Sequence, residues 1–334
     1  MPVIYTENDA DLEVLRERPI AIIDYTELGR STALNLRDNG FYPMIGALNE
    51  NRAARARSEG FEVAPPGEAA HKADLKLLML PDEQVAEAYL AYVAPSLRAG
   101  DMIVFASGYN VAFGFVEPPP FVDAVMIAPR AFGGAVREKF LTGEGFLSYV
   151  CVEQDATGKA WQRLLALAGA MGALKLGALE VTMRQESEMS QFIDQALMPA
   201  LHHLITSAVE ILIREGYPPE AALLDVYVSS KLSESMERAA QEGMIGFLRD
   251  FALITQYGML SRIDRFQDPK QRRQFELILE EIRKGKFAQE WTNEYHNGFP
   301  QLEAMRTKRA NLPVWRAESD AIEMLRQAKT RRKG

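Results

Sequence analysis

The hydrophobic pattern of this chain changes near Thr182, and this change constrains the fold more than any other feature. Up to about Glu180, short apolar runs alternate with amphipathic stretches. Continuous apolar runs are typical of strands buried on both faces, and the helical stretches between them predict βαβ units around a parallel sheet. After Thr182, apolar residues recur only at helical spacing. The sequence therefore predicts a Rossmann-like, doubly wound α/β domain over residues 1–181, followed by an all-α domain over residues 182–330.

The same patterns predict individual elements. Six short apolar runs predict strands, at residues 19–23, 42–47, 75–80, 102–105, 124–127 and 148–152. Apolar residues at helical spacing predict helices at residues 29–39, 52–59, 82–93, 157–171, 186–214, 219–241, 246–256, 269–284, 287–297 and 317–329. An α/β domain followed by a helical domain is a common plan for enzymes whose site lies at a domain interface.

Composition narrows the possible partners. The 334 residues contain 38 Lys plus Arg and 46 Asp plus Glu, a formal net charge of −8, so we expect neither nucleic acid nor membrane as partner. We find no basic, apolar leader and expect a cytoplasmic protein that binds a small molecule. The single cysteine, Cys151, excludes an internal disulfide and lies in an apolar run, which predicts a buried, inert thiol. Four scattered histidines are too few for a histidine metal site.

Several local strings share their order and spacing with one known family. They are Ala33-Leu34-Asn35-Leu36-Arg37-Asp38-Asn39-Gly40, Leu80-Pro81-Asp82-Glu83, Ser107-Gly108-Tyr109-Asn110, Ala128-Pro129-Arg130, Gly216-Tyr217 with Pro219-Glu220, Lys284-Gly285-Lys286-Phe287-Ala288 and Glu290-Trp291. Through these strings the chain resembles ketol-acid reductoisomerase, in its short bacterial-type class. The resemblance implies that family's two-domain fold, an NADPH cofactor, two Mg²⁺ ions and a homodimer intertwined through the helical domain.

The dinucleotide turn of that family, G-x-G-x-x-G, is altered here. The window is Asp24-Tyr25-Thr26-Glu27-Leu28-Gly29, and only the third glycine is present. We expect Asp24, Glu27 and the Cβ of Thr26 to hinder a pyrophosphate through charge and crowding. After the second strand, Glu50 favours a ribose hydroxyl and Arg52 a 2′-phosphate, so NADP and NAD both stay open. The resemblance assigns cofactor contacts to Tyr25, Thr26, Gly29, Arg52, Pro81, Asp82 and Gly133.

The metal ligands implied by the resemblance are altered as well. The family holds two Mg²⁺ with carboxylates four residues apart on two helices. These positions carry Ser190 and Asp194 on the first stretch, and Asp225 and Ser229 on the second. Because Mg²⁺ demands hard oxygen ligands in near-octahedral geometry, we expect no Mg²⁺ site. Glu186, in the first turn of the first helix, is expected to be a solvated capping acid.

The catalytic side chains of the first domain also differ. The resemblance places a histidine where this chain has Ser107, and a lysine where it has Arg130. Serine does not titrate near neutral pH, so no imidazole proton shuttle is left, and arginine keeps a charge without acting as an acid. The catalytic candidates are Ser107, Arg130, Asp194 and Asp225.

Three hypotheses for the function remain open at this point. One is an oxidoreductase that uses NAD(P)H to reduce a small carbonyl or imine without metal. Another is a cofactor-independent enzyme of a different class, acting on a cationic amine or sulfonium substrate. It would use an acidic interdomain cleft built from Asp24, Glu27, Asp194, Asp225 and Asp250, with Glu27 and Asp250 binding the substrate. The last hypothesis is a non-catalytic relative.

Overall fold

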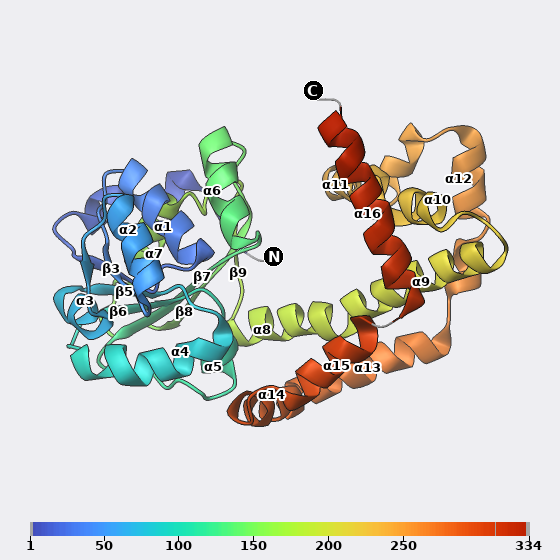
Figure 1. The fold of residues 1–334 in the computed structure, drawn as a ribbon. Coiled ribbons are helices and arrows are strands. Elements are labelled where there is room, and N and C mark those ends of the chain that lie inside the picture. The colour runs from blue at the N-terminus through green and yellow to red at the C-terminus, as the bar shows by residue number, and fades with distance from the viewer. Residues whose placement is uncertain (1–2, 311, 332–334) are drawn as a thin grey trace. The chain divides into compact units, whose positions relative to one another are not determined.

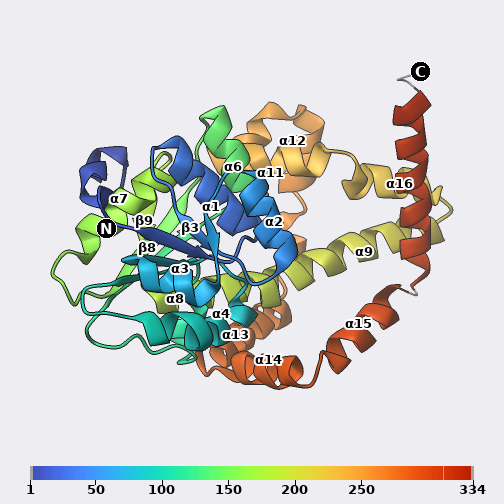
Figure 2. The same ribbon diagram turned by 60° about the vertical axis from the view of Figure 1, so that its left-hand side comes forward.

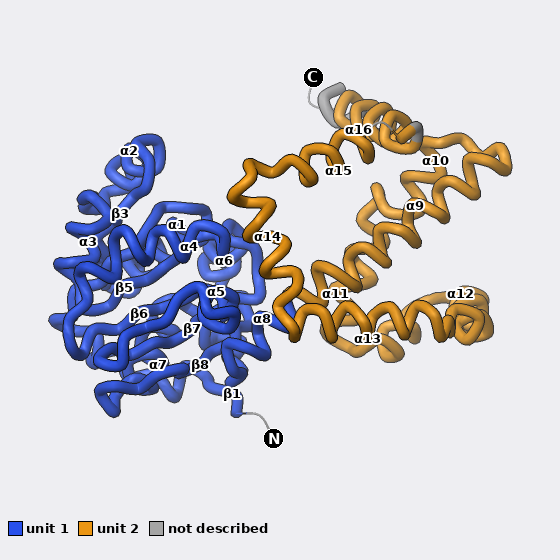
Figure 3. The backbone as a smooth tube through the Cα atoms, turned by 90° about the horizontal axis from the view of Figure 1, so that it is seen from below, with its two compact units in different colours: residues 1–190 blue, residues 191–334 orange. Residues whose placement is uncertain are grey.

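The computed structural model describes residues 3–310 and 312–331 and consists of two compact units, residues 1–190 and 191–334 (Figure 3). The division falls within a long helical stretch whose first helix, α8, spans Met183–Phe192. The first turns of α8 therefore belong to the sheet unit. The domain boundary expected at residue 181 stays a prediction.

The first unit is built on a nine-stranded sheet of order β1-β9-β8-β7-β6-β5-β2-β3-β4. The six strands from β4 to β7 in this order are parallel, as the apolar runs predict. The prediction of an all-parallel sheet is wrong at the other edge, where β8 runs antiparallel to β7 and β1 antiparallel to β9. The strands are β1 Ile4–Tyr5, β2 Ile20–Ile23, β3 Met44–Gly46, β4 Val63–Ala64, β5 Leu75–Leu78, β6 Met102–Phe105, β7 Asp123–Pro129, β8 Ser148–Gln154 and β9 Ala178–Glu180.

Helices cover both faces of this sheet (Figures 1 and 2). Side chains alternate between the faces along each strand, so Ile22 and Leu77 enter one core and Ile23 and Leu78 the other. One face carries α1 Glu27–Asp38, α2 Glu50–Ser58, α6 Gly133–Thr142 and α7 Ala160–Met171, and the other carries α3 Pro66–Lys72, α4 Asp82–Ala88 and α5 Tyr109–Ala112. The predicted Rossmann-like architecture is confirmed.

The edge formed by the carboxyl ends of the parallel strands gathers most of the predicted site residues. Strand β2 lies between β3 and β5, so the direction of winding reverses there, and such a switch point opens a crevice outside the strand ends. Asp24 follows β2, and Asp82 comes four residues after β5. Ser107 follows β6 after one residue, and Arg130 directly follows β7.

The second unit is helical throughout its described residues. Its small core contains Val209, Leu223, Val314 and Ala321. The predicted continuous helix over residues 219–241 is wrong, because the backbone becomes extended at Ser229. The helices are α9 Met198–Arg214, α10 Pro219–Leu223, α11 Lys231–Glu242, α12 Leu253–Leu260, α13 Pro269–Arg283, α14 Lys286–His296, α15 Pro300–Ala310 and α16 Pro313–Arg331, with π-helical segments at Ile193–Leu197 and Leu224–Val228 and 3₁₀ turns at Gly246–Asp250 and Ile263–Phe266.

One helical stretch is unusually apolar. Met183–Arg214 runs for 32 residues with a mean hydropathy of 1.5 over its most apolar window, and 11% of that window is buried. By length and composition alone, it is long and apolar enough to cross a membrane. The expectation that the protein has no membrane partner stays a prediction.

Gly29 allows a close approach at the start of α1, and this predicts an effect on stability. A Cβ at Gly29 would lie 2.5 Å from the carbonyl oxygen of Asp24, whereas a Cβ at Gly134 would meet nothing within 4 Å. We expect Gly29→Ala to destabilise the fold by about 1–3 kcal/mol because backbone must shift. The matched change Gly134→Ala should be neutral or stabilising by up to about 1 kcal/mol. Urea unfolding of both variants measures the difference, and equal effects would contradict the close approach.

Candidate active site

The turn after β2 uses an aspartate where the resemblance places the first glycine. Asp24 has a φ of 68°, the left-handed conformation that a glycine would adopt and that aspartate tolerates better than most residues. Its carboxylate is fully buried and accepts hydrogen bonds from the backbone N–H groups of Tyr25 at 2.8 Å and Leu48 at 3.2 Å. It also forms an ion pair with Arg52. The turn therefore keeps its shape although the glycine is gone.

The second acid of the turn is also paired. Glu27 contacts the guanidinium of Arg55 at 2.5 Å, and both side chains are about half exposed. The expectation that Asp24 and Glu27 repel a phosphate is corrected, because an arginine of α2 neutralises each of them. Arg52, expected to contact a phosphate, is held by Asp24.

The remaining residues of the turn point inward. Thr26 donates a hydrogen bond to the Met79 carbonyl at 2.7 Å and accepts one from the Gly29 N–H at 3.1 Å, so it caps α1. The ring of Tyr25 is buried, and its hydroxyl donates to Glu59 at 2.6 Å. Burial and the bond to Glu59 raise the pKa of Tyr25, so the hydroxyl stays protonated, and the predicted cofactor contact of Tyr25 stays a prediction.

The start of α1 offers backbone hydrogen-bond donors to a phosphate group. The first N–H groups of the twelve-residue helix α1, those of Glu27 and Leu28, are the donors that a helix N-terminus offers to a phosphate. Gly133 packs against them so closely that a Cβ there would lie 2.7 Å from the Leu28 nitrogen. Pro81 is exposed at the neighbouring strand end. The turn thus keeps the backbone features of a phosphate site and lacks two glycines.

A second cluster lies at the ends of β5 and β6. The Ser107 hydroxyl donates to the Asp82 carboxylate at 3.2 Å and accepts a hydrogen bond from the Tyr109 N–H at 3.1 Å. Asn110 donates to the Asp82 carbonyl at 2.9 Å. Burial raises the pKa of the Asp82 carboxyl to about 7, and the negative charge of Glu186 adds to the rise, while the bond from Ser107 opposes it. A carboxyl with this pKa exchanges a proton near neutral pH.

A third cluster joins the end of β7 to helix α8. Glu186 is buried, and its carboxylate contacts the Arg130 guanidinium at 2.9 Å and accepts from the Gly108 N–H at 2.9 Å. Arg130 also donates to the Ser190 hydroxyl at 3.1 Å, and Ser190 donates to Glu186 at 3.0 Å. The guanidinium lies 4.8 Å from the centre of the Tyr149 ring. The expectation that Glu186 is solvated is wrong, because it is the buried partner of this cation.

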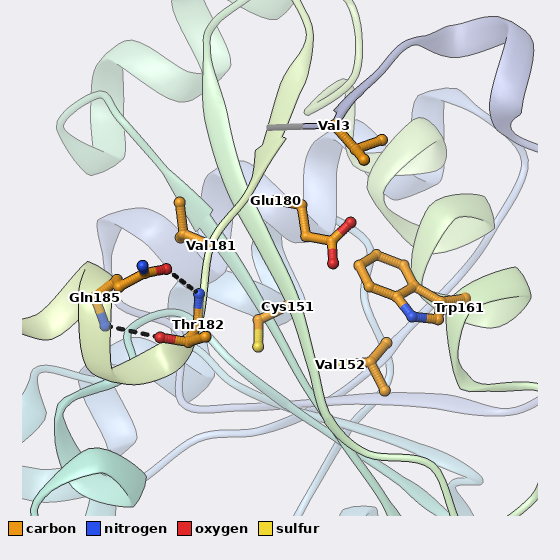
Figure 4. Close-up of a pocket in the computed structure, with 8 residues that line it drawn as sticks. All are labelled: Val3, Cys151, Val152, Trp161, Glu180, Val181, Thr182 and Gln185. Atoms are coloured by element: carbon orange, nitrogen blue, oxygen red, sulfur yellow. Dashed lines mark hydrogen bonds between the residues drawn. The ribbon is translucent and has the colours of Figure 1, made fainter. Parts of the chain in front are cut away.

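Local sequence signals explain why α8 brings Glu186 here. Thr182 and Gln185 form a capping box, each side chain bonding the other's backbone N–H at 3.0 Å (Figure 4). Gly108 lies directly under the helix start, since a Cβ there would lie 2.2 Å from the Met183 carbonyl oxygen. The helix therefore begins earlier than the predicted residue 186, and Glu186 faces inward.

The predicted acids of the helical unit are exposed. Asp225 lies 3.7 Å from the ammonium of Lys231, and Asp250 pairs with Arg238 at 2.7 Å. Asp194 lines a cavity of about 560 Å³ together with His202 and Trp315. Within residues 3–310 and 312–331, no three His, Cys, Asp or Glu side chains gather as they would around a metal ion.

Cys151 lies in a cavity of about 330 Å³ beside Trp161 and Glu180 (Figure 4). Burial raises the pKa of its thiol to about 11, so the thiol stays protonated at neutral pH. The prediction of a buried, inert thiol is confirmed.

Two family models match this chain. An acetohydroxy acid isomeroreductase NADPH-binding domain matches residues 14–177, and a ketol-acid reductoisomerase C-terminal domain matches residues 183–327. The chain belongs to the ketol-acid reductoisomerase family. The resemblance in the sequence is thereby confirmed, and so is the presence of a domain of the NADPH-binding type.

Members of the ketol-acid reductoisomerase family are similar to this chain over nearly its whole length. The "Ketol-acid reductoisomerase (NADP(+))" of Pyrobaculum calidifontis is 38% identical, over 94% of this chain and 96% of its own. That of Pyrobaculum aerophilum is 36% identical, over 97% and 99%. The solved structure of an NADH-preferring ketol-acid reductoisomerase from an uncultured archean matches with a TM-score of 0.89 at 30% identity, covering 96% of this chain and 98% of that one.

The sequence named Ser107 and Arg130 as catalytic candidates but did not show which residues they contact. Asp82 was expected to contact the cofactor, and its bond to Ser107 joins residues 25 positions apart. Glu186 and Asn110 were not among the predicted site residues. The capping box at Thr182 and Gln185 is the sequence signal that would have placed Glu186 on the inner face of α8.

The raised pKa of Asp82 predicts a pH-dependent stability. The carboxyl titrates near pH 7 in the folded state and near 3.9 in the unfolded state, so between these values the folded protein holds the extra proton. The contribution of Asp82 to the free energy of unfolding therefore falls as pH rises from about 4 to 7, by at most about 4 kcal/mol.

Urea unfolding of the wild type and of Asp82→Asn at pH 5 and pH 8 isolates this contribution. The variant should gain stability relative to the wild type at pH 8, because the wild type then carries a buried charge. Glu83→Gln, a change of the exposed neighbouring acid, should show a much smaller gain, because it removes only a minor repulsion of the Asp82 charge. If the free energies of unfolding of wild type and Asp82→Asn differed by the same amount at pH 5 and at pH 8, the raised pKa of Asp82 would be refuted.

Proposed function

We propose that this protein reduces a small carbonyl or imine substrate with NAD(P)H, and that it does so without the Mg²⁺-dependent isomerisation for which its relatives are named. The NADPH-binding domain of the family and the switch point in strand order at β2 support the reductase part. The departures at the expected metal ligands support the loss of isomerisation. Composition alone supports a cytoplasmic location and the lack of nucleic-acid or membrane partners.

One contact carries the proposal. The Arg130 guanidinium donates to the hydroxyl of Ser190, at the position where the family resemblance implies a metal-binding carboxylate. The same guanidinium is anchored on Glu186. The hydroxyl that stands at this ligand position is therefore already engaged by Arg130 and Glu186, and it carries no negative charge to hold a divalent ion.

The residues at the four implied ligand positions do not fit two Mg²⁺ ions. Two positions carry hydroxyls, Ser190 and Ser229, and the Ser190 hydroxyl is already bonded to Arg130 and Glu186. Asp225 has the ammonium of Lys231 as its neighbour. Mg²⁺ is held by carboxylates and water in near-octahedral geometry, and this set supplies too few hard, unengaged oxygens.

Arg130 offers the chemistry that a reduction needs. When bound, NAD(P)H supplies a hydride to the carbonyl or imine carbon of the substrate. Negative charge then develops on the substrate oxygen or nitrogen, and a preorganised cation beside it stabilises that charge. The Arg130 side chain is about a third exposed and is held in place by Glu186 and the ring of Tyr149, so its charge is both accessible and fixed. Arginine keeps its proton, so the proton for the product comes from another group.

The alternative hypothesis of a cationic substrate loses part of its support. It needs unpaired negative charge at the first turn, and Asp24 and Glu27 are each paired with an arginine. Asp250 is paired with Arg238. A non-catalytic relative remains the alternative that the next experiment decides.

Cofactor binding and turnover test the proposal together. We expect NADPH or NADH to bind with micromolar affinity in EDTA, with no gain from Mg²⁺, as measured by nucleotide fluorescence and calorimetry. Pyruvate, glyoxylate and a cyclic imino acid are the probes for reduction, and acetolactate should give no dihydroxy acid. Mg²⁺-dependent conversion of acetolactate would overturn the proposal, and the absence of nucleotide binding would favour a non-catalytic protein.

A matched pair of variants tests the role of Arg130. Arg130→Met should lower the rate of reduction by at least about 100-fold with little change in nucleotide affinity, because charge stabilisation is lost. Arg137→Met, on the same β7–α6 segment, removes an arginine that pairs with Asp38 and should leave the rate nearly unchanged. Equal losses in both variants would count against a specific role of Arg130.

We also propose that the protein is a homodimer joined through its helical unit. The helical stretch Met183–Arg214 leaves most of its apolar window unburied within one chain. Its exposed apolar side chains include Leu197, Met198, Leu201, Leu204 and Ile211. A second copy that covers this surface would bury apolar area at about 25 cal/mol per Å², and the family resemblance implies such an intertwined dimer.

Light scattering tests the dimer against the membrane alternative. We expect twice the 37.4 kDa chain mass at micromolar concentration without detergent. Leu201→Glu combined with Leu204→Glu should weaken the dimer, because charge replaces buried apolar surface. The wild type should not float with lipid vesicles of mixed anionic and neutral composition. A stable monomer, or flotation with the vesicles, would contradict the dimer proposal.

A further inference from the structure

The hydroxyl of Ser107 makes two hydrogen bonds and can accept one more. A serine hydroxyl donates one hydrogen bond and accepts two. One accepting site is used by the Tyr109 N–H at 3.1 Å. The hydroxyl proton is directed at the Asp82 carboxylate at 3.2 Å. One accepting site is left, and what happens to it depends on the protonation of Asp82.

Protonation of Asp82 reverses the direction of the bond between the two side chains. The carboxylate of the ionised form only accepts, so Ser107 must donate to it. The protonated carboxyl donates to Ser107 and fills the last accepting site. The serine proton is then free to turn toward a third group, while the Tyr109 N–H keeps the oxygen in place.

We propose that Asp82 and Ser107 form a proton-delivery pair, in which Ser107 donates a proton to the substrate oxygen or nitrogen and Asp82 resupplies Ser107. This inference rests on the proposed reductase function and extends it to the source of the proton. The pair would replace the histidine that the family resemblance places at position 107. Ser107 is then a catalytic residue, and Asp82 is a positioning and resupplying residue that acts through it.

The step balances in atoms and charge for a carbonyl substrate. The hydride from NAD(P)H forms a C–H bond at the carbonyl carbon, and the C=O π electrons move to oxygen. That oxygen takes the Ser107 proton, and Ser107 takes the proton of Asp82. The products are an alcohol, NAD(P)⁺ and ionised Asp82, which regains a proton from solvent.

The surroundings of Asp82 suit this role. Two acids raise its pKa, Glu186 from α8 and Glu83 from its own helix, and the charge of Asp82 in turn raises the pKa of Tyr109 in α5. Burial and the charge of Glu186 favour the protonated form, so the carboxyl pKa of about 7 keeps the proton available at neutral pH. The side-chain amide of Asn110 donates a hydrogen bond to the backbone carbonyl of Asp82 and thereby fixes the backbone of that residue.

A substrate-independent experiment tests the pair directly. In protein labelled with ¹³C at the aspartate carboxyl carbons, the Asp82 signal is identified by its loss in Asp82→Asn. We expect its titration midpoint to lie near pH 7 in the wild type. The midpoint should rise in Ser107→Ala, which removes the bond to the ionised form, and return in Ser107→Thr. A midpoint below pH 5, or one that ignores Ser107→Ala, overturns the pair.

The rate of reduction tests the delivery step. With NADPH and whichever probe is reduced, the single-turnover rate should fall about tenfold for each pH unit above 7, as the protonated fraction of Asp82 falls. Measured at saturating NADPH, Asp82→Asn should lose this dependence and at least about 100-fold in rate. Ser107→Ala should lose a similar factor, and Ser107→Thr should recover most of it.

The two experiments separate the failure of the pair from the failure of the proposed function. If wild type reduces a probe and Asp82→Asn does so at an unchanged rate and pH profile, the pair is wrong and the reductase function stands. If no probe is reduced although NADPH binds, the proposed function fails. The delivery step then falls with the function, and the carboxyl titration reports only whether Asp82 and Ser107 are coupled.

Discussion

The buried carboxylate of Glu186 contacts two strand-end loops of the candidate site at once. It receives a backbone N–H from Gly108 after β6 and the guanidinium of Arg130 after β7. Removal of one partner from a buried pair of this kind usually costs a protein several kcal/mol, because the remaining charge is left without compensation. Glu186 therefore fixes where Arg130 points, and through its charge it also keeps Asp82 protonated to a higher pH.

The effect of the acidic residues in the candidate site depends on which cations they pair with more than on how many acids the chain has. An excess of acids suggested an acidic cleft, yet Asp24 and Glu27 each meet an arginine of α2. The replacement of a glycine by Asp24 also became tolerable in this way, since the arginine and two backbone N–H groups satisfy the carboxylate that the substitution buries. A motif can therefore lose its characteristic residues and still keep the backbone path that they supported.

The sequence predicted six of the strands, the covering helices α1, α2, α4 and α7 and the helical second unit, because apolar periodicity reports burial directly. It did not predict the covering helices α3, α5 and α6. It missed β1, β4 and β9, which are two or three residues long and carry no periodic signal. It also missed the antiparallel pairing of β8, since pairing direction leaves no trace in a single strand. At the site, the sequence alone identified Ser107 and Arg130 as catalytic candidates. It did not show the bonds of Asp82 and Glu186, because they join residues 25 to 78 positions apart.

Gly108 gives the proton-delivery pair its rigidity. Its backbone lies against the Met183 carbonyl with no room for a Cβ, so the loop after β6 is pressed between the sheet and the start of α8. The conformational entropy of Ser107 is therefore lost when the protein folds and not when a substrate binds. Gly108 thus preorganises the Ser107 hydroxyl. Efforts to give this protein new substrates should therefore leave residue 108 unchanged and vary side chains that face the crevice.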